Sequence, residues 1–367
     1  MIHRSPHPTP SIPDVSLTDH VFARADEWPD RPAITCGVTG QSYTFAALRA
    51  AIRACAAGLW ARGLRKGDVI GLVSPNVPDF VVLLHGAASI GAITTTVNPA
   101  ATAEEIAGQL RDARARLLVT ASAMIEKARE VATLLPLDDV VVFGSTAGAT
   151  SFAALLRPDL PAPDVPIDPA RDLVVLPYSS GTSGLPKGVM LTHRNLVANL
   201  VQITAADRII EPDDRLVAVL PFFHIYGMVP VMNGALSQGC PMVTLPRFDL
   251  ELFLTTIETH GITFAHVVPP ILVALAKHPI VDTYTLDSLR ALFSGAAPLG
   301  SDLAQAVERR LHCVVRQGYG LTETSPVTHF HPLHGDHVLH GSVGPLVPGT
   351  EARLVDAATG RDSAPGE

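Results

Sequence analysis

The sequence contains little lysine, which occurs only at positions 66, 127, 187 and 277 of its 367 residues. It has no cluster of basic residues, and its formal net charge is −8 at pH 7. Proteins that bind nucleic acids contact the phosphates with clustered basic side chains, so we do not expect a nucleic-acid partner. The scarcity makes Lys187 notable, because it lies in a stretch rich in glycine and serine.

Cysteine is also scarce, and the four cysteines show no C-x-x-C spacing: Cys36, Cys55, Cys240 and Cys313. Such scattered cysteines are typical of reduced thiols that are buried as small hydrophobic side chains. Because disulfides are rare in the cytosol, we expect a cytoplasmic protein without a disulfide framework.

Long hydrophobic runs are missing as well. The most apolar region, residues 80–97, is interrupted by His85, Gly86 and Gly91, whereas a membrane helix needs about 20 mostly apolar residues. Residues 1–16 are rich in proline and histidine and lack the apolar segment of a secretory signal. We therefore expect neither a membrane-spanning segment nor a membrane partner.

The composition that is present indicates a large buried core. Hydrophobic residues make up 47% of the chain and charged residues 17%, which excludes a disordered protein. Strand-like and helix-like segments alternate along most of the sequence, a pattern that predicts parallel sheets covered by helices. The predicted fold is α/β, with two doubly wound βα subdomains and an incomplete small β subdomain at the C-terminus.

Changes in composition give the expected domain boundaries. Residues 1–16 are expected to be a flexible arm. Residues 17–170 form the expected first βα subdomain, which ends in a proline-rich connector. Residues 171–340 form the second, with the nucleotide and acid sites, and residues 341–367 begin a β subdomain that is truncated.

Residues 178–189 carry the strongest functional signal. They follow an apolar run at 173–176 that predicts a buried strand, and they contain four serine or threonine hydroxyls, three glycines and Lys187. Glycines allow backbone N–H groups to form a concave anion site, to which hydroxyls and a lysine add donors. A surface turn is the alternative, but it does not require so many phosphate donors. The spacing differs from that of the G-x-x-x-x-G-K-[ST] loop.

Two further stretches follow predicted strands, where ligands of doubly wound sheets bind. Residues 221–227 place His224 between aromatic side chains, as in a pocket wall with one polar tip. The alternative is a histidine of the core. Residues 293–299 are a run of small residues that permits either a flat ligand or tight helix–strand packing.

A third stretch, residues 317–324, combines an aromatic side chain, a hydroxyl and a carboxylate. A purine could stack on Tyr319, and Glu323 could hold Mg²⁺, which prefers oxygen ligands shared with phosphates. The alternative is an ordinary turn before a helix.

Together these stretches resemble, in order and spacing, the adenylate-forming enzymes: acyl-CoA synthetases, peptide-synthetase adenylation domains and beetle luciferases. The resemblance covers nearly the whole chain. It implies that a carboxylate and ATP give acyl-AMP and pyrophosphate, after which coenzyme A takes the acyl group as a thioester. ATP, Mg²⁺ and coenzyme A as a co-substrate are therefore expected.

The resemblance also implies site residues. The expected catalytic residues are Lys187 for the β- and γ-phosphates, Thr322 for the α-phosphate, Glu323 for Mg²⁺ and His224 for the substrate carboxylate. The ATP or AMP site is expected to comprise Ser179, Ser180, Gly181, Thr182, Ser183, Gly184, Lys187, Gly295, Ala296, Ala297, Gln317, Gly318, Tyr319, Gly320 and Thr322. The acid is expected to contact His224, Tyr226, Gly227, Gly295, Gly318, Pro326 and Val327.

The motifs look most like those of 4-coumarate–CoA ligases and related aryl-CoA ligases, notably at residues 224–227, 268–279 and 294–299. Amino-acid-activating relatives place an aspartate in the second stretch, which residues 223–226 lack. A cinnamate, a benzoate or anthranilate is therefore the implied substrate. A medium-chain fatty-acid–CoA ligase, a luciferase-like oxygenase and a non-catalytic acid- or acyl-adenylate-binding fragment are the alternatives.

The family continues beyond a Gly-Glu turn that residues 365–367 begin. It carries there an aspartate for the ribose, a hinge and a C-terminal lid domain with the adenylation lysine. We therefore expect an N-terminal fragment without the lid domain, with both pockets but impaired catalysis. The acceptor thiol, coenzyme A or a carrier protein, and the oligomeric state stay open.

Overall fold

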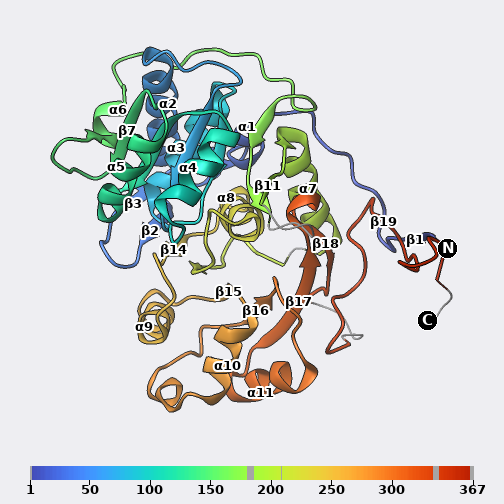
Figure 1. Cartoon of the computed structure of the whole chain (residues 1–367). Coiled ribbons are helices and arrows are strands. Elements are labelled where there is room, and N and C mark those ends of the chain that lie inside the picture. Colours follow the sequence, from blue (N-terminus) through green and yellow to red (C-terminus); the bar gives the residue numbers. More distant parts are fainter. Residues whose placement is uncertain (1, 180–185, 208, 334–338, 364–367) are drawn as a thin grey trace.

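The computed structural model describes residues 2–179, 186–207, 209–333 and 339–363. Two sheets dominate it (Figure 1), and most neighbouring strands in both are parallel, which confirms the predicted α/β fold. The antiparallel neighbours are β12–β9, β2–β3 and β17–β18. No described helix has both the length and the apolar character needed to cross a bilayer.

The first sheet has the strand order β12-β9-β5-β4-β6-β7-β8. Its strands are β4 (Val69–Val73), β5 (Ile93–Thr96), β6 (Ala115–Ala121), β7 (Asp139–Phe143), β8 (Thr150–Ser151), β9 (Leu173–Val175) and β12 (Leu191–Thr192). The helix α2 (Phe45–Ala61) precedes β4, and the helices between the strands are α3 (Pro78–Ser89), α4 (Ala103–Asp112), α5 (Ile125–Leu134) and α6 (Phe152–Leu155). Every residue of β4 and β5 is buried, as expected for strands covered on both faces.

The second sheet has the order β18-β17-β16-β15-β13-β14-β2-β3. Its strands are β2 (Pro32–Cys36), β3 (Ser42–Thr44), β13 (Leu216–Ala218), β14 (Met242–Thr244), β15 (Phe264–Val267), β16 (Ala291–Ser294), β17 (Val314–Gly320) and β18 (Val327–Phe330). The accompanying helices are α7 (His193–Ala206), a π-helix (Gly227–Asn233), α8 (Gly234–Ser237), α9 (Leu250–His260), α10 (Pro269–Lys277) and α11 (Ser301–Leu311).

Local sequence signals account for the helix starts. Thr44 caps α2, because its hydroxyl accepts a hydrogen bond from the backbone N–H of Ala47 at 3.2 Å. At α4, Thr102 and Glu105 form a reciprocal capping box, with bonds of 3.2 and 2.8 Å. Both patterns satisfy N–H groups that have no partner inside the helix.

The sheets exchange strands across residue 170, the expected subdomain boundary. β2 and β3 come from the first part of the chain, yet β2 pairs with β14 of the second sheet. In turn, β9 and β12 follow residue 170 and complete the first sheet next to β5. Apolar periodicity predicts a strand but not its partner, since pairing depends on packing between distant segments. The expected boundary therefore does not separate the two sheets.

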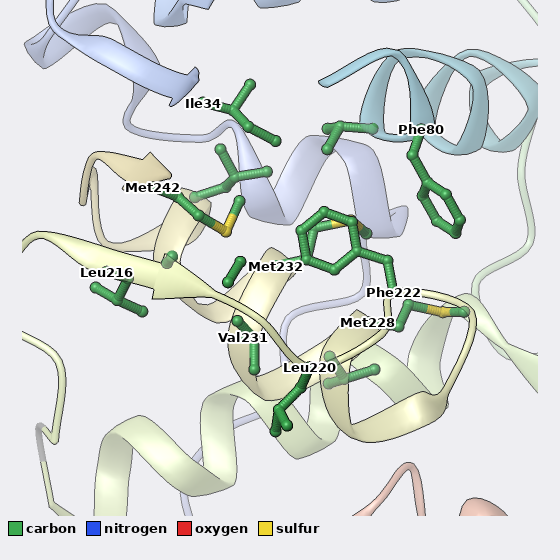
Figure 2. Close-up of a cluster of buried hydrophobic side chains, with 14 of the residues drawn as sticks. Ile34, Phe80, Leu216, Leu220, Phe222, Met228, Val231, Met232 and Met242 are labelled. Atoms are coloured by element: carbon green, nitrogen blue, oxygen red, sulfur yellow. The ribbon is translucent and has the colours of Figure 1, made fainter. Parts of the chain in front are cut away.

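One hydrophobic core joins the two sheets. Figure 2 shows Ile34 of β2, Phe80 of α3 and Leu216 of β13 in one buried cluster, and each of these side chains is fully buried. The ring centroids of Phe80 and Phe222 lie 5.6 Å apart in an edge-on arrangement. The shared core implies that the two sheets stabilise each other.

The first residues are paired, although residues 1–16 were expected to be a flexible arm. β1 (Ile2–Arg4) forms an antiparallel ribbon with β19 (Glu351–Arg353), and Arg4 donates to Glu351 at 2.8 Å. Figure 1 shows this ribbon at one side of the molecule, beyond β18. Composition alone carries no sign of so short a long-range pairing.

Candidate functional site

A cleft of about 1040 Å³ lies at the carboxyl ends of the second sheet's strands. A short hairpin, the segment after β13, the segment after β16 and the region from β17 to β18 form its walls. The cleft brings together these predicted site residues: Ser179, Lys187, His224, Tyr226, Gly295, Ala296, Gly318, Tyr319, Gly320, Thr322, Glu323, Pro326 and Val327.

The hairpin is the stem of the predicted anion loop. β10 (Tyr178–Ser179) pairs antiparallel with β11 (Lys187–Gly188), with Ser179 directly opposite Lys187. The predicted loop residues Ser180, Gly181, Thr182, Ser183 and Gly184 lie outside the described residues. The stem itself contributes a hydroxyl and an ammonium group to one wall of the cleft.

Tyr178 ties the hairpin to the first sheet's layer of helices. Its hydroxyl donates to Oδ2 of Asp112, at the end of α4. Burial and the neighbouring carboxylate both raise the pKa of Tyr178 far above its usual value, so it stays protonated as a donor.

Glu323 faces the hairpin across the cleft. Its Oε1 accepts a hydrogen bond of 2.8 Å from the Ser179 hydroxyl, and Thr322 precedes it in a short 3-10 turn. No three His, Cys, Asp or Glu side chains of the described chain are placed to hold a metal ion. Mg²⁺ that arrives with a polyphosphate needs only one or two carboxylates, because phosphate oxygens and water supply the other ligands. Glu323 therefore fits Mg²⁺ carried by ATP.

His224 lies exposed at the cleft, which excludes the alternative of a core histidine. Its Nδ1 accepts a hydrogen bond of 3.2 Å from the backbone N–H of Tyr226. Desolvation by the cleft walls lowers its pKa, so the neutral form is favoured. In that form the proton sits on Nε2, which leaves a hydrogen-bond donor for a ligand.

Tyr226 forms an apolar wall. Its hydroxyl donates to the carbonyl oxygen of Phe293 at 3.1 Å, and Nδ1 of the buried His266 lies 3.1 Å from the hydroxyl oxygen. Because the phenol proton goes to the carbonyl, Nδ1 of His266 is the donor in the second bond. Gly295 packs on the ring, since a Cβ there would lie 2.8 Å from Cε1 of Tyr226. The hydroxyl is thus fully engaged, and the ring alone faces the ligand.

Glycines of β17 let a neighbouring strand approach closely. A Cβ on Gly318 would lie 2.8 Å from the carbonyl oxygen of His329, and a Cβ on Gly320 would lie 2.1 Å from that of Pro326. Tyr319, between them, is 48% exposed and presents an aromatic face at the cleft.

Three predicted site residues do not line the cleft. The Gln317 side chain clamps the backbone of Leu299, with bonds of 3.2 and 3.1 Å. Gly227 is buried where a Cβ would lie 2.1 Å from the carbonyl oxygen of Pro221. Ala297 is exposed outside the cleft. Gln317 and Gly227 therefore shape the backbone around the cleft.

Other lining residues lie outside the predicted set: Tyr178, Gly188, Val189, Ile225, Phe293, Ser294 and Leu321. All are close neighbours of predicted residues, so the cleft is lined by the same segments that carry the motifs. A more distant residue, Asn76, holds the segment after β13. Its side chain donates to the carbonyl oxygens of Ala218 and Leu220, at 3.1 and 2.9 Å, and accepts from the N–H of Phe222 at 2.8 Å. No local sequence signal predicts that role.

Comparison with known proteins shows the family and the fold of this chain. A family model described as AMP-binding enzyme matches residues 21–367. A 4-coumarate–CoA ligase from Oryza sativa subsp. japonica is 39% identical over 362 residues, which cover 95% of this chain and 65% of that protein.

Solved structures show the same architecture. The anthranilate–CoA ligase AuaEII in complex with anthranoyl-AMP gives a TM-score of 0.88 at 24% identity, over 96% of this chain and 67% of that chain, a likeness of fold. ATP-bound MatB from Rhodopseudomonas palustris gives 0.83 at 28% identity, over 97% and 69%. The chain thus spans about two thirds of the length of these proteins.

Proposed function

Because the chain belongs to the AMP-binding enzyme family, we propose that it activates a carboxylic acid with ATP, giving an acyl adenylate and pyrophosphate. One observation carries the proposal: a single cleft gathers Lys187 with Ser179, His224 and the Thr322–Glu323 pair. Lys187 is a cation, Ser179, His224 and Thr322 are neutral hydrogen-bond donors, and Glu323 is a carboxylate. The reaction requires such groups at the phosphates, at the substrate carboxylate and at the metal ion.

The roles follow from the charges that move. The acid's carboxylate oxygen attacks the α-phosphorus of ATP, the bond from this phosphorus to the bridging oxygen breaks, and pyrophosphate leaves. Lys187 and the hairpin would neutralise the departing phosphates, and the Thr322 hydroxyl would contact the α-phosphate. Glu323 would hold Mg²⁺, which when bound offsets charge on the phosphate oxygens.

His224 would act on the acid. Its Nε2–H can donate to a carboxylate oxygen and orient the other oxygen toward phosphorus. A protonated ring would pair with the carboxylate and reduce its nucleophilicity. The lowered pKa of His224 favours the neutral donor at neutral pH.

The acid itself would be aromatic, of the benzoate, anthranilate or cinnamate type. The Tyr226 ring, Gly295, Pro326 and Val327 give an apolar slot at the cleft, and apolar walls with few polar anchors suit a flat ring. No carboxylate lies among residues 223–226 to pair with the ammonium of an α-amino acid. The rice relative named above is a 4-coumarate–CoA ligase, and we propose coenzyme A as the acyl acceptor in a protein of that length.

A screen of aromatic and aliphatic acids, with ATP and Mg²⁺, tests the proposal by acid-dependent release of pyrophosphate. The same mixtures are scanned for a rise in melting temperature, because a ligand that binds the folded state stabilises it. Aromatic acids should give the largest effects. Larger effects with medium-chain fatty acids would overturn the aromatic assignment, and binding without pyrophosphate would favour an acid-binding module.

Replacement of Lys187 tests the phosphate side. Lys187→Ala should lower acid-dependent pyrophosphate release about 100-fold, because a charge on the leaving group is no longer neutralised. Acid binding measured by calorimetry should change far less. Lys277→Ala is the matched control, since Lys277 is exposed at the end of α10, away from the cleft. Unchanged acid-dependent pyrophosphate release in Lys187→Ala would show that Lys187 does not neutralise the departing phosphates.

A further inference from the structure

Strand β5 of the first sheet ends in three consecutive threonines. Two of them form hydrogen bonds to segments that line the cleft, one to the segment before the hairpin and one to the segment that carries His224. Thr94, Thr95 and Thr96 are 0%, 0% and 3% exposed. A strand that is buried on both faces normally carries apolar side chains, and a buried hydroxyl costs free energy unless it forms a hydrogen bond. Each of these hydroxyls therefore requires an explanation.

Thr96 holds the acid side. Its hydroxyl donates to the carbonyl oxygen of Phe223 at 2.7 Å. Phe223 directly precedes His224, whose ring is oriented by the N–H of Tyr226. The bond fixes the peptide from which His224 extends.

Thr95 holds the phosphate side. Its hydroxyl donates to the carbonyl oxygen of Leu176 at 2.8 Å, and the backbone N–H of Leu176 donates to the carbonyl oxygen of Thr94 at 2.9 Å. Leu176 leads directly into the hairpin through Pro177 and Tyr178. Both backbone polar groups of Leu176, its N–H and its carbonyl oxygen, are therefore hydrogen-bonded to β5, which fixes the base of the hairpin.

Gln109 of α4 connects the two contacts. Its side-chain nitrogen donates to the Thr95 hydroxyl and to the Thr96 carbonyl, both at 3.1 Å. The Thr95 oxygen therefore accepts one bond while its proton goes to Leu176. Thr94 differs, because its buried hydroxyl has no hydrogen-bond partner among the described atoms.

We infer that Thr96 and Thr95 are positioning residues, Thr96 for His224 and the acid, and Thr95 for the phosphate hairpin. The inference rests on the proposed function, because it assigns the two halves of the cleft to the acid and to ATP. Through these two residues, the carboxyl end of β5 sets the positions of the acid and of ATP relative to each other. If either half is displaced, it binds its own reactant less well, which raises the KM for that reactant. The rate falls as well, because adenylation requires an in-line approach.

Thr96→Val and Thr95→Val remove one hydroxyl each at nearly constant volume. Thr96→Val should raise the KM for the acid about tenfold and leave the KM for ATP little changed, and Thr95→Val should show the reverse. Thr96→Ser keeps the donor and should restore the wild-type values. Thr94→Val is the matched control, on the same face of the strand as Thr96, and should change neither constant.

Hydrogen exchange gives a readout that does not depend on turnover. Amides of residues 222–228 should exchange about tenfold faster in Thr96→Val, and the amides of Leu176, Tyr178 and Ser179 in Thr95→Val, because local opening becomes easier. If Thr96→Val does not fold, Thr96→Ala removes the same hydroxyl. Equal effects of Thr94→Val, or the same change in both halves for either variant, would overturn the inference. Localised exchange in a protein that neither binds ATP nor releases pyrophosphate with any acid would instead refute the proposed function.

Discussion

Gly295 is the residue at which the acid pocket has least room for change. A methyl group there would lie 2.8 Å from a ring carbon of Tyr226, and two hydrogen bonds on the Tyr226 hydroxyl keep that ring from moving away. We therefore expect Gly295→Ala to weaken acid binding by about tenfold or more through overpacking.

Titration calorimetry with the best acid from the screen measures this effect. Gly300→Ala provides the control, because Gly300 follows the same strand, has a φ of −69°, and a Cβ added there would meet no atom within 4 Å. Unaltered acid affinity in Gly295→Ala would show that the ring does not bound the acid site.

The sequence motifs predicted segments that the fold brings to one cleft, but they did not predict how each side chain is oriented there. Strand-end motifs located Lys187, His224 and Glu323, because glycine, hydroxyl and carboxylate residues in dense runs are unusual for a turn. The same motifs suggested Gln317 as a nucleotide contact, although its amide is used to clamp Leu299. Thr96 was not predicted, since its partner Phe223 is 127 residues away and the meaning of a buried threonine depends on that partner.

At the scale of elements, one ion pair and one hydrogen bond join the amino ends of three strands. Asp214 precedes β13, Thr263 precedes β15 and Arg290 precedes β16. Arg290 donates to the buried Asp214 at 2.7 Å, and the Thr263 hydroxyl donates to the same carboxylate at 2.6 Å. Burial alone would raise the pKa of Asp214, but these donors lower it below its usual value. The cluster lies at the edge of the sheet opposite the cleft.

Arg290→Ala should therefore lower the free energy of unfolding by about 3–5 kcal/mol, because it leaves a buried carboxylate without its cation. The KM values for the acid and for ATP should stay close to those of the wild type. Urea unfolding measures the loss, and Arg24→Ala is the comparison, since Arg24 pairs with Glu27 on the surface and should cost less than about 1 kcal/mol. Similar losses in both variants would contradict a structural role for the buried pair.

Strand positions were predictable, whereas strand partners were not. The apolar runs at β4, β13 and β15 predict buried strands, and all residues of these three strands are buried. Nothing local indicates that Thr35 of β2 lies opposite Val243 of β14. The exchange of strands therefore appears only when the packing of the whole chain is known.

Across the whole molecule, buried neutral histidines make stability depend on pH. Burial lowers the pKa of His85 and His266 to about 3 and that of His193 to about 4, from an ordinary value near 6.5. The unfolded chain then binds more protons than the folded one, so stability falls as the pH falls. Each neutral histidine contributes its full stabilisation above pH 6.5, and this stabilisation is lost as the pH falls from 6.5 to about 4 or 3. Over that range, the free energy of unfolding falls by up to about 1.4 kcal/mol per pH unit for each histidine.

Urea unfolding at several pH values between 7.5 and 4.5 should show this slope. His193→Asn keeps an acceptor for the backbone N–H of Leu17, to which Nδ1 of His193 is bonded at 3.0 Å, and it removes one titrating group. Its stability should fall less steeply with acidification, by about 1.4 kcal/mol per pH unit. The exposed His260→Asn should retain the wild-type slope, and an equally steep slope in His193→Asn would rule out its contribution.

The exchange of strands between the sheets also has a consequence during synthesis. A ribosome releases β2 and β3 early, and these two strands pair with each other, but β14, the other partner of β2, is made much later, after the whole first sheet. Until then, β2 waits with an unpaired edge and apolar side chains such as Ile34 exposed. Such an edge is a site for aggregation. In a nascent chain of this topology, the edge of β2 therefore has to be kept from pairing with other strands while more than half of the chain is translated.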